Sequence, residues 1–443
     1  MKKTLICILS VLLALMVALT FVACSAKEET AKPTEEVKKK PAGPKEDVST
    51  WHAEGFEKST LKNQISWEGI NSVPIKTANM DITEARQICV DFFRYAKTCT
   101  WIPDAHYGIW ADAVIHENEK PKREMDYGVT YGGLPYISWA TGSPYRLMDY
   151  IDEETGVVNM ANAGDKPILF GNQCANGAYV GFARVINSAK YGVTAKMLQA
   201  NGFLNLGDYT YSKDLQSWKR TYGTPNVIGE NSRDVMMESY ALLKAGDPIV
   251  YWTTAGHVVM IATDAVVIRD DNGKIDPYKS FVTIIDQSVS FVPYQHEGGD
   301  LCQIAENVDA KWNFQQLYAG NYLPMTFAEW TGEDPIEETE VTYSHTGDTI
   351  TIDQLYGSKI TTNYYLFDIY AHIYNSAGIE VCKIARRYES TNTRELAFEK
   401  GAFAEEVWGS YEDLDPEEEY TVKVVAQIGT GERPTVWEGK LVQ

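Results

Sequence analysis

Residues 243–263 read Leu-Lys-Ala-Gly-Asp-Pro-Ile-Val-Tyr-Trp-Thr-Thr-Ala-Gly-His-Val-Val-Met-Ile-Ala-Thr. Gly246-Asp247 is typical of a turn, and the β-branched and aromatic residues after it occur in runs of strand length. The polar segment 271–273 is a second turn signal. The sequence predicts four strands here: Pro248–Trp252, His257–Thr263, Val266–Arg269 and Phe281–Ile285. Consecutive strands joined by short turns indicate an antiparallel sheet.

Helical patterns precede this run of strands. Asp81 is a candidate N-cap, Glu84 follows three residues later, and Ile88, Phe92 and Tyr95 recur at helical spacing. Three helices are predicted: residues 81–99, Cys174–Lys190 and Ser232–Lys244. Residues 103–172 are rich in Gly, Pro, Tyr and Asn and are interpreted as loops around this core. Helices followed by antiparallel strands indicate an α+β fold, not a Rossmann alternation.

The charge of the chain excludes one class of partner. The 443 residues carry 61 acidic and 40 basic side chains, a net charge of −21, and 44% of the residues are hydrophobic. This composition is typical of a globular protein. Nucleic-acid binding is excluded, because a protein this acidic without a basic stripe cannot neutralise a phosphate backbone.

The N-terminus predicts export from the cytoplasm. Two lysines precede an apolar run, Leu5–Val22, and small residues follow it, as in a secretory signal. An uncleaved membrane anchor is the alternative. Val22-Ala23-Cys24 resembles the lipobox of bacterial lipoproteins, which implies that residues 1–24 are a signal peptide and that Cys24 is acylated. Residues 25–50, rich in Lys, Glu and Pro, are predicted to form a disordered tether outside the cell membrane.

The remaining cysteines give no sign of a metal centre. Five lie beyond Cys24, an odd number, so at least one thiol is outside any intramolecular disulfide: Cys89, Cys99, Cys174, Cys302 and Cys382. No zinc-like Cys or His spacing and no HExxH motif occurs. We therefore expect no metal and no other cofactor.

One cysteine has the context of a nucleophile. Cys174 lies where a loop, Gly171-Asn172-Gln173, enters an apolar helix. The N-terminus of a helix favours the thiolate, and its unpaired N–H groups can receive an oxyanion. The alternative is a buried structural cysteine.

A base and an orienting group are expected on the predicted strands. His257 begins an apolar strand, and imidazole titrates in the range that activates a thiol. Asp286 and Gln287 end the strand Phe281–Ile285, where either could hold the imidazole tautomer. We select Asp286 and keep Gln287 as the alternative third member. A core histidine and ordinary strand-end polarity are the alternative interpretations.

These motifs together resemble those of papain-like bacterial cell-wall cysteine peptidases, in particular the NlpC-type endopeptidases. Residues 243–247 match the family's turn, Gly256-His257-Val258 matches its Gly-His-Val, and Gly133-Leu134-Pro135-Tyr136 is similar to its Gly-x-Pro-Tyr. The resemblance covers residues 80–290. It implies a papain-like domain at residues 51–331, the catalytic residues Cys174, His257 and Asp286, and a site-lining role for Tyr136.

The sequence departs from that family around the cysteine. Gln173-Cys174-Ala175 replaces Asp-Cys-Ser, and the Asp286/Gln287 pair replaces a third residue that is often histidine. The combination Cys, Gly-His, Ile-Asp also resembles bacteriocin-processing peptidases, which have a Cys-His-Asp triad. In that branch a glutamine serves the oxyanion hole several residues before the cysteine, and Gln173 is the corresponding candidate.

The pattern becomes all-β beyond residues 331–335. Strands are predicted at Thr349–Ile352, Tyr364–Tyr374, Glu380–Arg386 and Tyr420–Ile428. The segment 414–426, with Tyr420 before alternating apolar residues, resembles the tyrosine corner of fibronectin type III domains. This resemblance implies a β-sandwich at residues 333–443, which holds 22 acidic and 9 basic side chains. We interpret it as a spacer, with wall or partner binding as the alternative.

The sequence therefore predicts a lipid-anchored extracytoplasmic cysteine peptidase that faces the cell wall. The expected substrates are the stem peptides of peptidoglycan. The alternatives are a non-catalytic surface-binding lipoprotein with a degenerate papain-like domain, and a papain-like peptidase that acts on proteins.

Overall fold

The computed structural model describes less than half of residues 1–307 and nearly all of residues 308–443. The described residues are 72–103, 107–109, 123–125, 130–134, 157–158, 173–187, 203–212, 222–253, 256–287, 294–295, 301–303, 308–387, 393–399 and 404–442. The predicted signal peptide with Cys24, the tether, Tyr136 and most of the expected loop region lie outside these ranges. The described residues belong to one compact unit.

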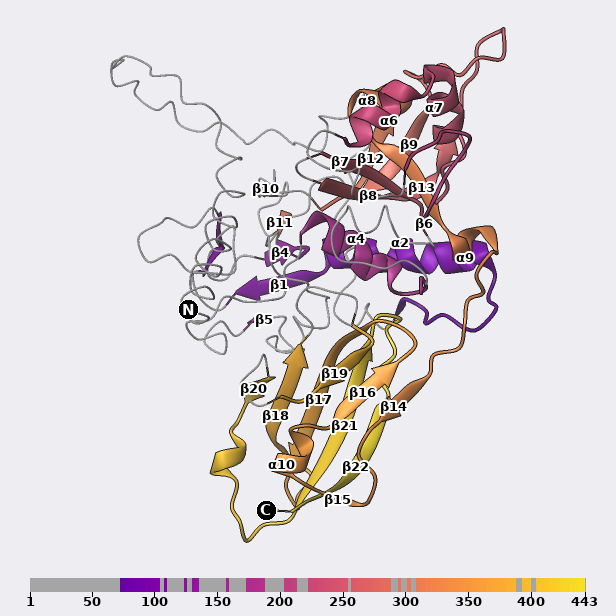
Figure 1. The fold of residues 1–443 in the computed structure, drawn as a ribbon. Helices are drawn as coiled ribbons and strands as arrows, with labels where there is room; N and C mark the ends of the chain where they lie inside the picture. Colours follow the sequence, from indigo (N-terminus) through magenta and orange to yellow (C-terminus); the bar gives the residue numbers. More distant parts are fainter. Residues whose placement is uncertain are drawn as a thin grey trace, which may run out of the picture. The chain divides into compact units, whose positions relative to one another are not determined.

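A six-stranded antiparallel sheet forms the centre of the first half of this unit (Figure 1). The strands run in the order β12 (Val308–Asn313), β9 (Phe281–Ile285), β8 (Gly256–Val266), β7 (Pro248–Trp252), β13 (Leu323–Phe327) and β6 (Phe203–Asn205). The predicted antiparallel run is thus confirmed, with β7 and β9 at the predicted bounds. The predicted strand Val266–Arg269 is wrong: Val266 ends β8, and Arg269 makes only an isolated bridge to Ile275.

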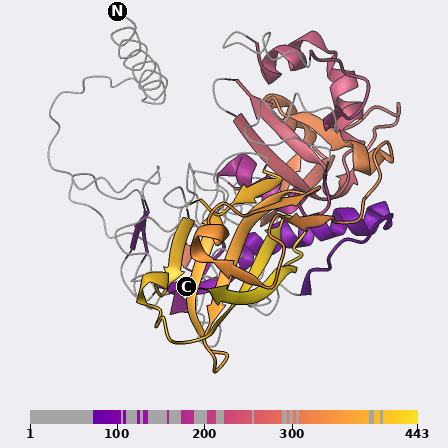
Figure 2. The same ribbon diagram turned by 60° about the horizontal axis from the view of Figure 1, so that its bottom comes forward.

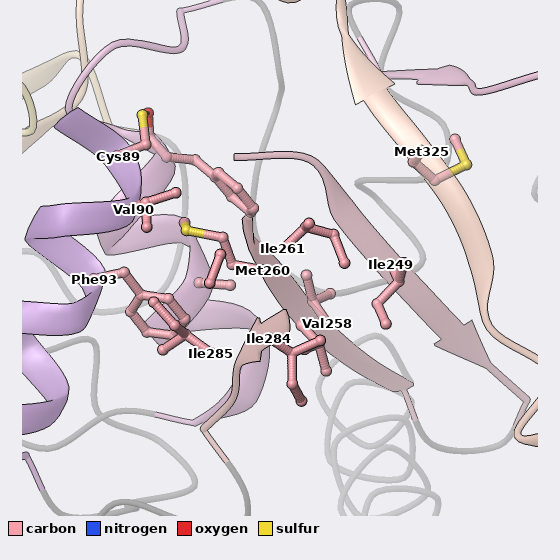
Figure 3. Packing of buried hydrophobic residues seen from close by; sticks show 14 of the residues in the cluster. Cys89, Val90, Phe93, Ile249, Val258, Met260, Ile261, Ile284, Ile285 and Met325 are labelled. Atoms are coloured by element: carbon pink, nitrogen blue, oxygen red, sulfur yellow. The ribbon is translucent and has the colours of Figure 1, made fainter. Parts of the chain in front are cut away.

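Two helices pack against this sheet. They are α2 (Ile82–Thr98) and α4 (Cys174–Phe182), which contact each other and β8. Figure 2, turned by 60°, shows the indigo α2 beside the same strands. In Figure 3, Cys89, Val90 and Phe93 of α2 face Met260 of β8 and Ile285 of β9. All five side chains are at most 1% exposed, so this face is a closed core.

A glycine makes the close approach of these helices to the sheet possible. A Cβ on Gly181 of α4 would lie 2.7 Å from the Met260 methyl carbon and 2.7 Å from Phe93 Cβ. Such contacts are shorter than real Cβ atoms tolerate, so the position admits no larger residue without movement. Gly181 therefore fixes the spacing between α4, α2 and β8.

The helix boundaries partly match the predictions. Asp81 caps α2 as predicted, because its carboxylate accepts the N–H groups of Thr83 and Glu84. Ser232 caps α7 (Arg233–Tyr240) in the same way. The predicted helices Cys174–Lys190 and Ser232–Lys244 were too long, since α4 ends at Phe182 and α7 at Tyr240. Turns follow both helices, and their apolar residues stay buried: Val185, Ile186 and Leu243.

Shorter elements complete this half. The helices are α6 (Thr224–Glu230), α8 (Phe314–Ala319) and α9 (Ala328–Thr331). A second sheet has the order β10 (Tyr294–Gln295), β11 (Leu301–Gln303), β4 (Thr130–Gly132), β1 (Thr100–Pro103) and β5 (Val157–Val158). A separate two-stranded sheet consists of β2 (Tyr107–Ile109) and β3 (Arg123–Met125). The fold is mixed α+β, as the sequence predicts.

A buried ion pair anchors the Gly-Asp turn before β7. Arg86 of α2 donates to the Asp247 carboxylate at 2.9 Å, and the two side chains are 9% and 1% exposed. Asp247 also accepts from the Thr326 hydroxyl at 2.7 Å and the Lys244 N–H at 2.9 Å. Gly246 has φ +79°, a conformation that L side chains rarely adopt. The Gly-Asp pair therefore joins α2, β7 and β13.

The C-terminal part is built from two further sheets. One has the order β14 (Val341–Tyr343), β16 (Lys359–Thr362), β19 (Glu395–Ala397). The other has the order β15 (Thr349–Thr351), β22 (Thr435–Val442), β21 (Tyr420–Ile428), β17 (Leu366–Tyr374), β18 (Glu380–Arg387), β20 (Ala404–Trp408). Apolar side chains from both sheets share one core, such as Ile360 with Ile369 and Val424. A short helix, α10 (Ile352–Leu355), follows β15.

The contact expected of a tyrosine corner is present. The Asp415 N–H donates to the Tyr420 hydroxyl at 2.9 Å, and that hydroxyl lies 3.3 Å from a Glu418 carboxylate oxygen. Tyr420 begins β21 and is 5% exposed. The hydroxyl therefore ties the start of β21 to the chain just upstream.

The C-terminal end of α4 packs on residues of the sheet that contains β17. Tyr179 lies 4.9 Å from Tyr365 and 5.9 Å from Phe367 between ring centroids. A Cβ on Gly429 would lie 2.9 Å from Ala183 Cβ, just beyond α4. The Arg394 guanidinium also donates to the Asn187 carbonyl at 2.6 Å. The region around α4 is therefore in direct contact with residues of the C-terminal part.

Candidate active site

Three predicted residues come together from three different elements. Cys174 is the first residue of α4, His257 is the second residue of β8, and Asp286 directly follows β9. The β8–β9 pairing places the last two on neighbouring strands. Since α4 packs against β8, it presents its N-terminus to the same place.

His257 is held by the Asp286 carboxylate. Nε2 of His257 lies 2.9 Å from Oδ1 of Asp286, and the two side chains are 20% and 3% exposed. Burial lowers the pKa of His257, but the charge and hydrogen bond of Asp286, together with the contacts of Cys174, raise it well above its ordinary value. The carboxylate therefore favours the charged form of the imidazole and lies against its Nε2.

Cys174 faces the other side of this pair. Its Sγ lies 3.6 Å from the Gly256 carbonyl oxygen, and its interaction with His257 contributes to the raised pKa of the imidazole. Since Nε2 is engaged by Asp286, Nδ1 is the ring nitrogen left for the thiol. Cys174 is 8% exposed, so the sulfur is almost closed off by the residues around it.

The turn before the helix leaves donors available. Gln173 is the N-cap of α4, but its side chain makes no capping hydrogen bond. Its carbonyl accepts the Gly177 N–H at 2.7 Å, the first hydrogen bond of the helix. The N–H groups of the first turn are therefore not capped by Gln173, which is the arrangement an oxyanion needs.

The other predicted site residues have different outcomes. Gln287 is 2% exposed and lies beside Asp286 in the chain, while the ion pair with His257 is made by Asp286. Tyr136 and Cys24 are outside the described residues, so their predicted roles stay predictions.

The remaining cysteines provide a contrast. Cys89, Cys99, Cys174 and Cys382 are all free thiols, which agrees with the expectation that at least one cysteine is unpaired. Burial strongly raises the pKa of Cys89, and it raises the pKa of Cys99 to about 12. Among these four thiols, Cys174 is the one that lies beside an imidazole.

An aromatic residue at this site was missed in the sequence. The Tyr322 ring lies 6.3 Å from the His257 ring, in an edge-to-face arrangement at 63°. Tyr322 follows Gly320-Asn321 and precedes the apolar run Leu323–Phe327. A turn signal followed by an aromatic residue at the head of a strand is the sequence feature that could have pointed to it.

No group of three or more His, Cys, Asp or Glu side chains suited to a metal ion occurs within the described ranges. None of the helices that the structure describes is both long and apolar enough to cross a bilayer.

The chain matches no protein-family model and no curated protein sequence.

Proposed function

We propose that the protein is a membrane-anchored extracytoplasmic cysteine peptidase that hydrolyses amide bonds in peptidoglycan stem peptides. The observation that carries the proposal is the convergence of Cys174, His257 and Asp286, with 2.9 Å between His257 Nε2 and Asp286 Oδ1. A thiol, an imidazole and a carboxylate in this order are the components of thiol-based acyl transfer.

The mechanism assigns one role to each residue. The Cys174 thiolate attacks the amide carbonyl carbon, and the His257 imidazolium gives its proton to the leaving amine. Asp286 orients His257 and stabilises its charge, because a buried carboxylate at 2.9 Å favours the imidazolium. N–H groups in the first turn of α4 are the expected donors to the oxyanion. Water then hydrolyses the thioester.

The fold is compatible with the family resemblance. A helix that begins with the cysteine packs on an antiparallel sheet, whose neighbouring strands carry the histidine and the third residue. This is the arrangement expected of a papain-like domain. The two sheets of residues 341–442, with the Tyr420 hydroxyl bond, support a fibronectin type III-like sandwich.

The choice of substrate rests on the sequence. A signal peptide, a lipid anchor on Cys24 and a charged tether would hold the enzyme within reach of the cell wall, where stem peptides are the abundant amides. A papain-like peptidase that cleaves proteins is the second candidate, because an aspartate in the third position is typical of the bacteriocin-processing branch.

Digestion of purified peptidoglycan tests this proposal. The full-length protein in mild detergent is incubated overnight with the polymer, beside Cys174→Ala, and the products are analysed by mass spectrometry. Cleaved stem peptides from the wild type alone are expected. No cleavage by a folded protein whose thiol is reactive would point to a protein substrate, whereas no cleavage with an unreactive thiol would favour a binding lipoprotein.

Thiol alkylation measures that reactivity separately. Iodoacetamide is added near neutral pH to a Cys302→Ser background, and the labelled cysteine is identified by peptide mapping. Cys89, Cys99 and Cys382 are 0% exposed whereas Cys174 is 8% exposed and lies beside His257, so we expect labelling at Cys174. Rapid labelling that is lost in His257→Ala supports an active thiol, and equal rates in the two proteins would contradict it.

A further inference from the structure

The turn before β13 holds Tyr322 in a fixed position. Asn321 has φ +57°, and a Cβ on Gly320 would lie 2.9 Å from Cε2 of the Tyr322 ring. The Tyr322 N–H donates to the Leu317 carbonyl at 3.0 Å, and the Tyr322 carbonyl accepts from the Tyr240 hydroxyl at 2.8 Å. The backbone on both sides of the ring is therefore anchored.

The Tyr322 ring itself is packed among aromatic rings. Its centroid lies 5.5 Å from that of Trp312, 6.1 Å from that of Tyr251 and 6.3 Å from that of His257. These separations lie within the range of favourable aromatic pairs. A ring held in this way keeps its hydroxyl in one place, so the hydroxyl can act without further loss of conformational entropy.

The Tyr322 ring lies beside the His257 ring, and its hydroxyl makes no hydrogen bond to any residue that the structure describes. Burial is the main reason that the pKa of Tyr322 is raised, and the charges of Asp286 and Cys174 raise it further. Burial and the neighbouring charges therefore favour the protonated form of the phenol. A protonated phenol that lies beside the imidazole, with its O–H unpaired among the described residues, can donate a hydrogen bond to a ligand.

We propose that the Tyr322 hydroxyl donates a hydrogen bond to the oxyanion that forms when Cys174 attacks an acyl carbonyl. This inference rests on the thiol chemistry proposed above. It adds a side-chain donor, carried by the turn between α8 and β13, to the N–H groups at the start of α4.

The step balances without any other reactant. An electron pair on the Cys174 sulfur forms the carbon–sulfur bond, and the carbonyl π pair moves onto the oxygen, which accepts from Tyr322 while the phenol keeps its proton. When the electron pair on the oxygen re-forms the carbonyl double bond, the carbon–nitrogen bond breaks and the amine leaves with the proton of His257. Water then gives one proton to His257 as its oxygen attacks the thioester, and the thiolate departs from the carboxylic acid product.

Two reagents separate this role from a structural one. Iodoacetamide reacts with a thiol by displacement of iodide and forms no oxyanion, whereas p-nitrophenyl acetate acylates the thiol through an oxyanion and releases nitrophenolate. Tyr322→Phe removes the hydroxyl and keeps the ring. Tyr251→Phe is the matched control, since the Tyr251 ring packs on Tyr322 and its hydroxyl pairs with Thr253.

The expected result is a selective loss. In the full-length protein with Cys302→Ser, Tyr322→Phe should be alkylated at the wild-type rate but acylated about 10²-fold more slowly, the effect of removing one oxyanion donor. Tyr251→Phe should match the wild type in both reactions, and circular dichroism should show all proteins folded.

Three results would overturn the inference. Acylation of Tyr322→Phe at the wild-type rate would show that the hydroxyl has no part in the reaction. An equal slowing of alkylation and acylation would assign Tyr322 a packing role. Alkylation of the wild type that does not depend on His257 would reject the proposed function itself, and this inference with it.

Discussion

Replacement of Asp286 by asparagine should slow the reaction of Cys174 with iodoacetamide. The change keeps the shape of a side chain that is 3% exposed and removes the charge 2.9 Å from His257 Nε2. At an effective dielectric constant of about 20, that charge pair is worth roughly 6 kcal/mol before the cost of burial. If only a quarter of this energy, about 1.4 kcal/mol, is lost from the stabilisation of the reactive thiolate, the alkylation rate falls about tenfold.

The assay is the second-order rate of alkylation between pH 5 and pH 10, in the Cys302→Ser background. We expect Asp286→Asn to react at least about tenfold more slowly near pH 7, because the imidazolium that supports the thiolate is lost. The two curves should converge towards pH 10, where cysteine thiols ionise without help. Asp234→Asn, an exposed aspartate paired with Lys274, is the control. Equal rates for wild type and Asp286→Asn at pH 7 would refute the reasoning.

The same substitution should make stability depend differently on pH. The folded-state pKa of His257 is raised, so its contribution to stability is complete below the unfolded value near 6.5 and disappears as the pH rises through the folded value. The advantage of the wild type over Asp286→Asn in the free energy of unfolding should therefore be larger near pH 6 than at alkaline pH. Urea titrations at several pH values measure it, and an advantage that grows with pH would contradict this sign.

Three further predictions concern the scaffold, each measured by urea denaturation of the full chain. Gly181→Ala should lower the free energy of unfolding by about 1–3 kcal/mol, because its Cβ would lie 2.7 Å from Phe93 Cβ, although alanine normally stabilises a helix; a more stable variant would contradict the packing. Asp247→Ala should cost about 3–5 kcal/mol by leaving the buried Arg86 charge uncompensated, and a change below 1 kcal/mol would argue against the pair. Tyr420→Phe should cost about 1 kcal/mol, the loss of the bond from the Asp415 N–H, and no change would mean that water replaces it.

Local patterns were sufficient for much of the fold. The cap at Asp81 and the strands Pro248–Trp252, Phe281–Ile285 and Tyr420–Ile428 lie where the sequence predicts them, because short-range turn chemistry and apolar runs determine them. The wrong helix ends were predicted where residues beyond the helix are also buried in the tertiary structure. Val185 and Ile186 continue the apolar pattern of α4, but they are buried from a turn after the helix has ended.

The candidate site also combines residues that local patterns predicted with one that depends on long-range packing. The sequence singled out Cys174, His257 and Asp286 because each lies at the end of a predicted element, and the structure brings them together. The turn signal before Tyr322 was not interpreted as part of a site, because a tyrosine before an apolar run is usually part of the core and only the long-range packing brings this one to His257. The strand β13 that follows was also missed, because its partners, β7 and β6, are distant in sequence.

The contact between α4 and the second half of the chain has a consequence for how such a protein can evolve. Tyr179, Ala183 and Asn187 present a surface shaped to Tyr365, Gly429 and Arg394. A recombination event that joined the first half to a different C-terminal module would leave these residues facing water, or facing a surface with the wrong shape. We therefore expect that a substitution on one side of this contact needs a compensating substitution on the other.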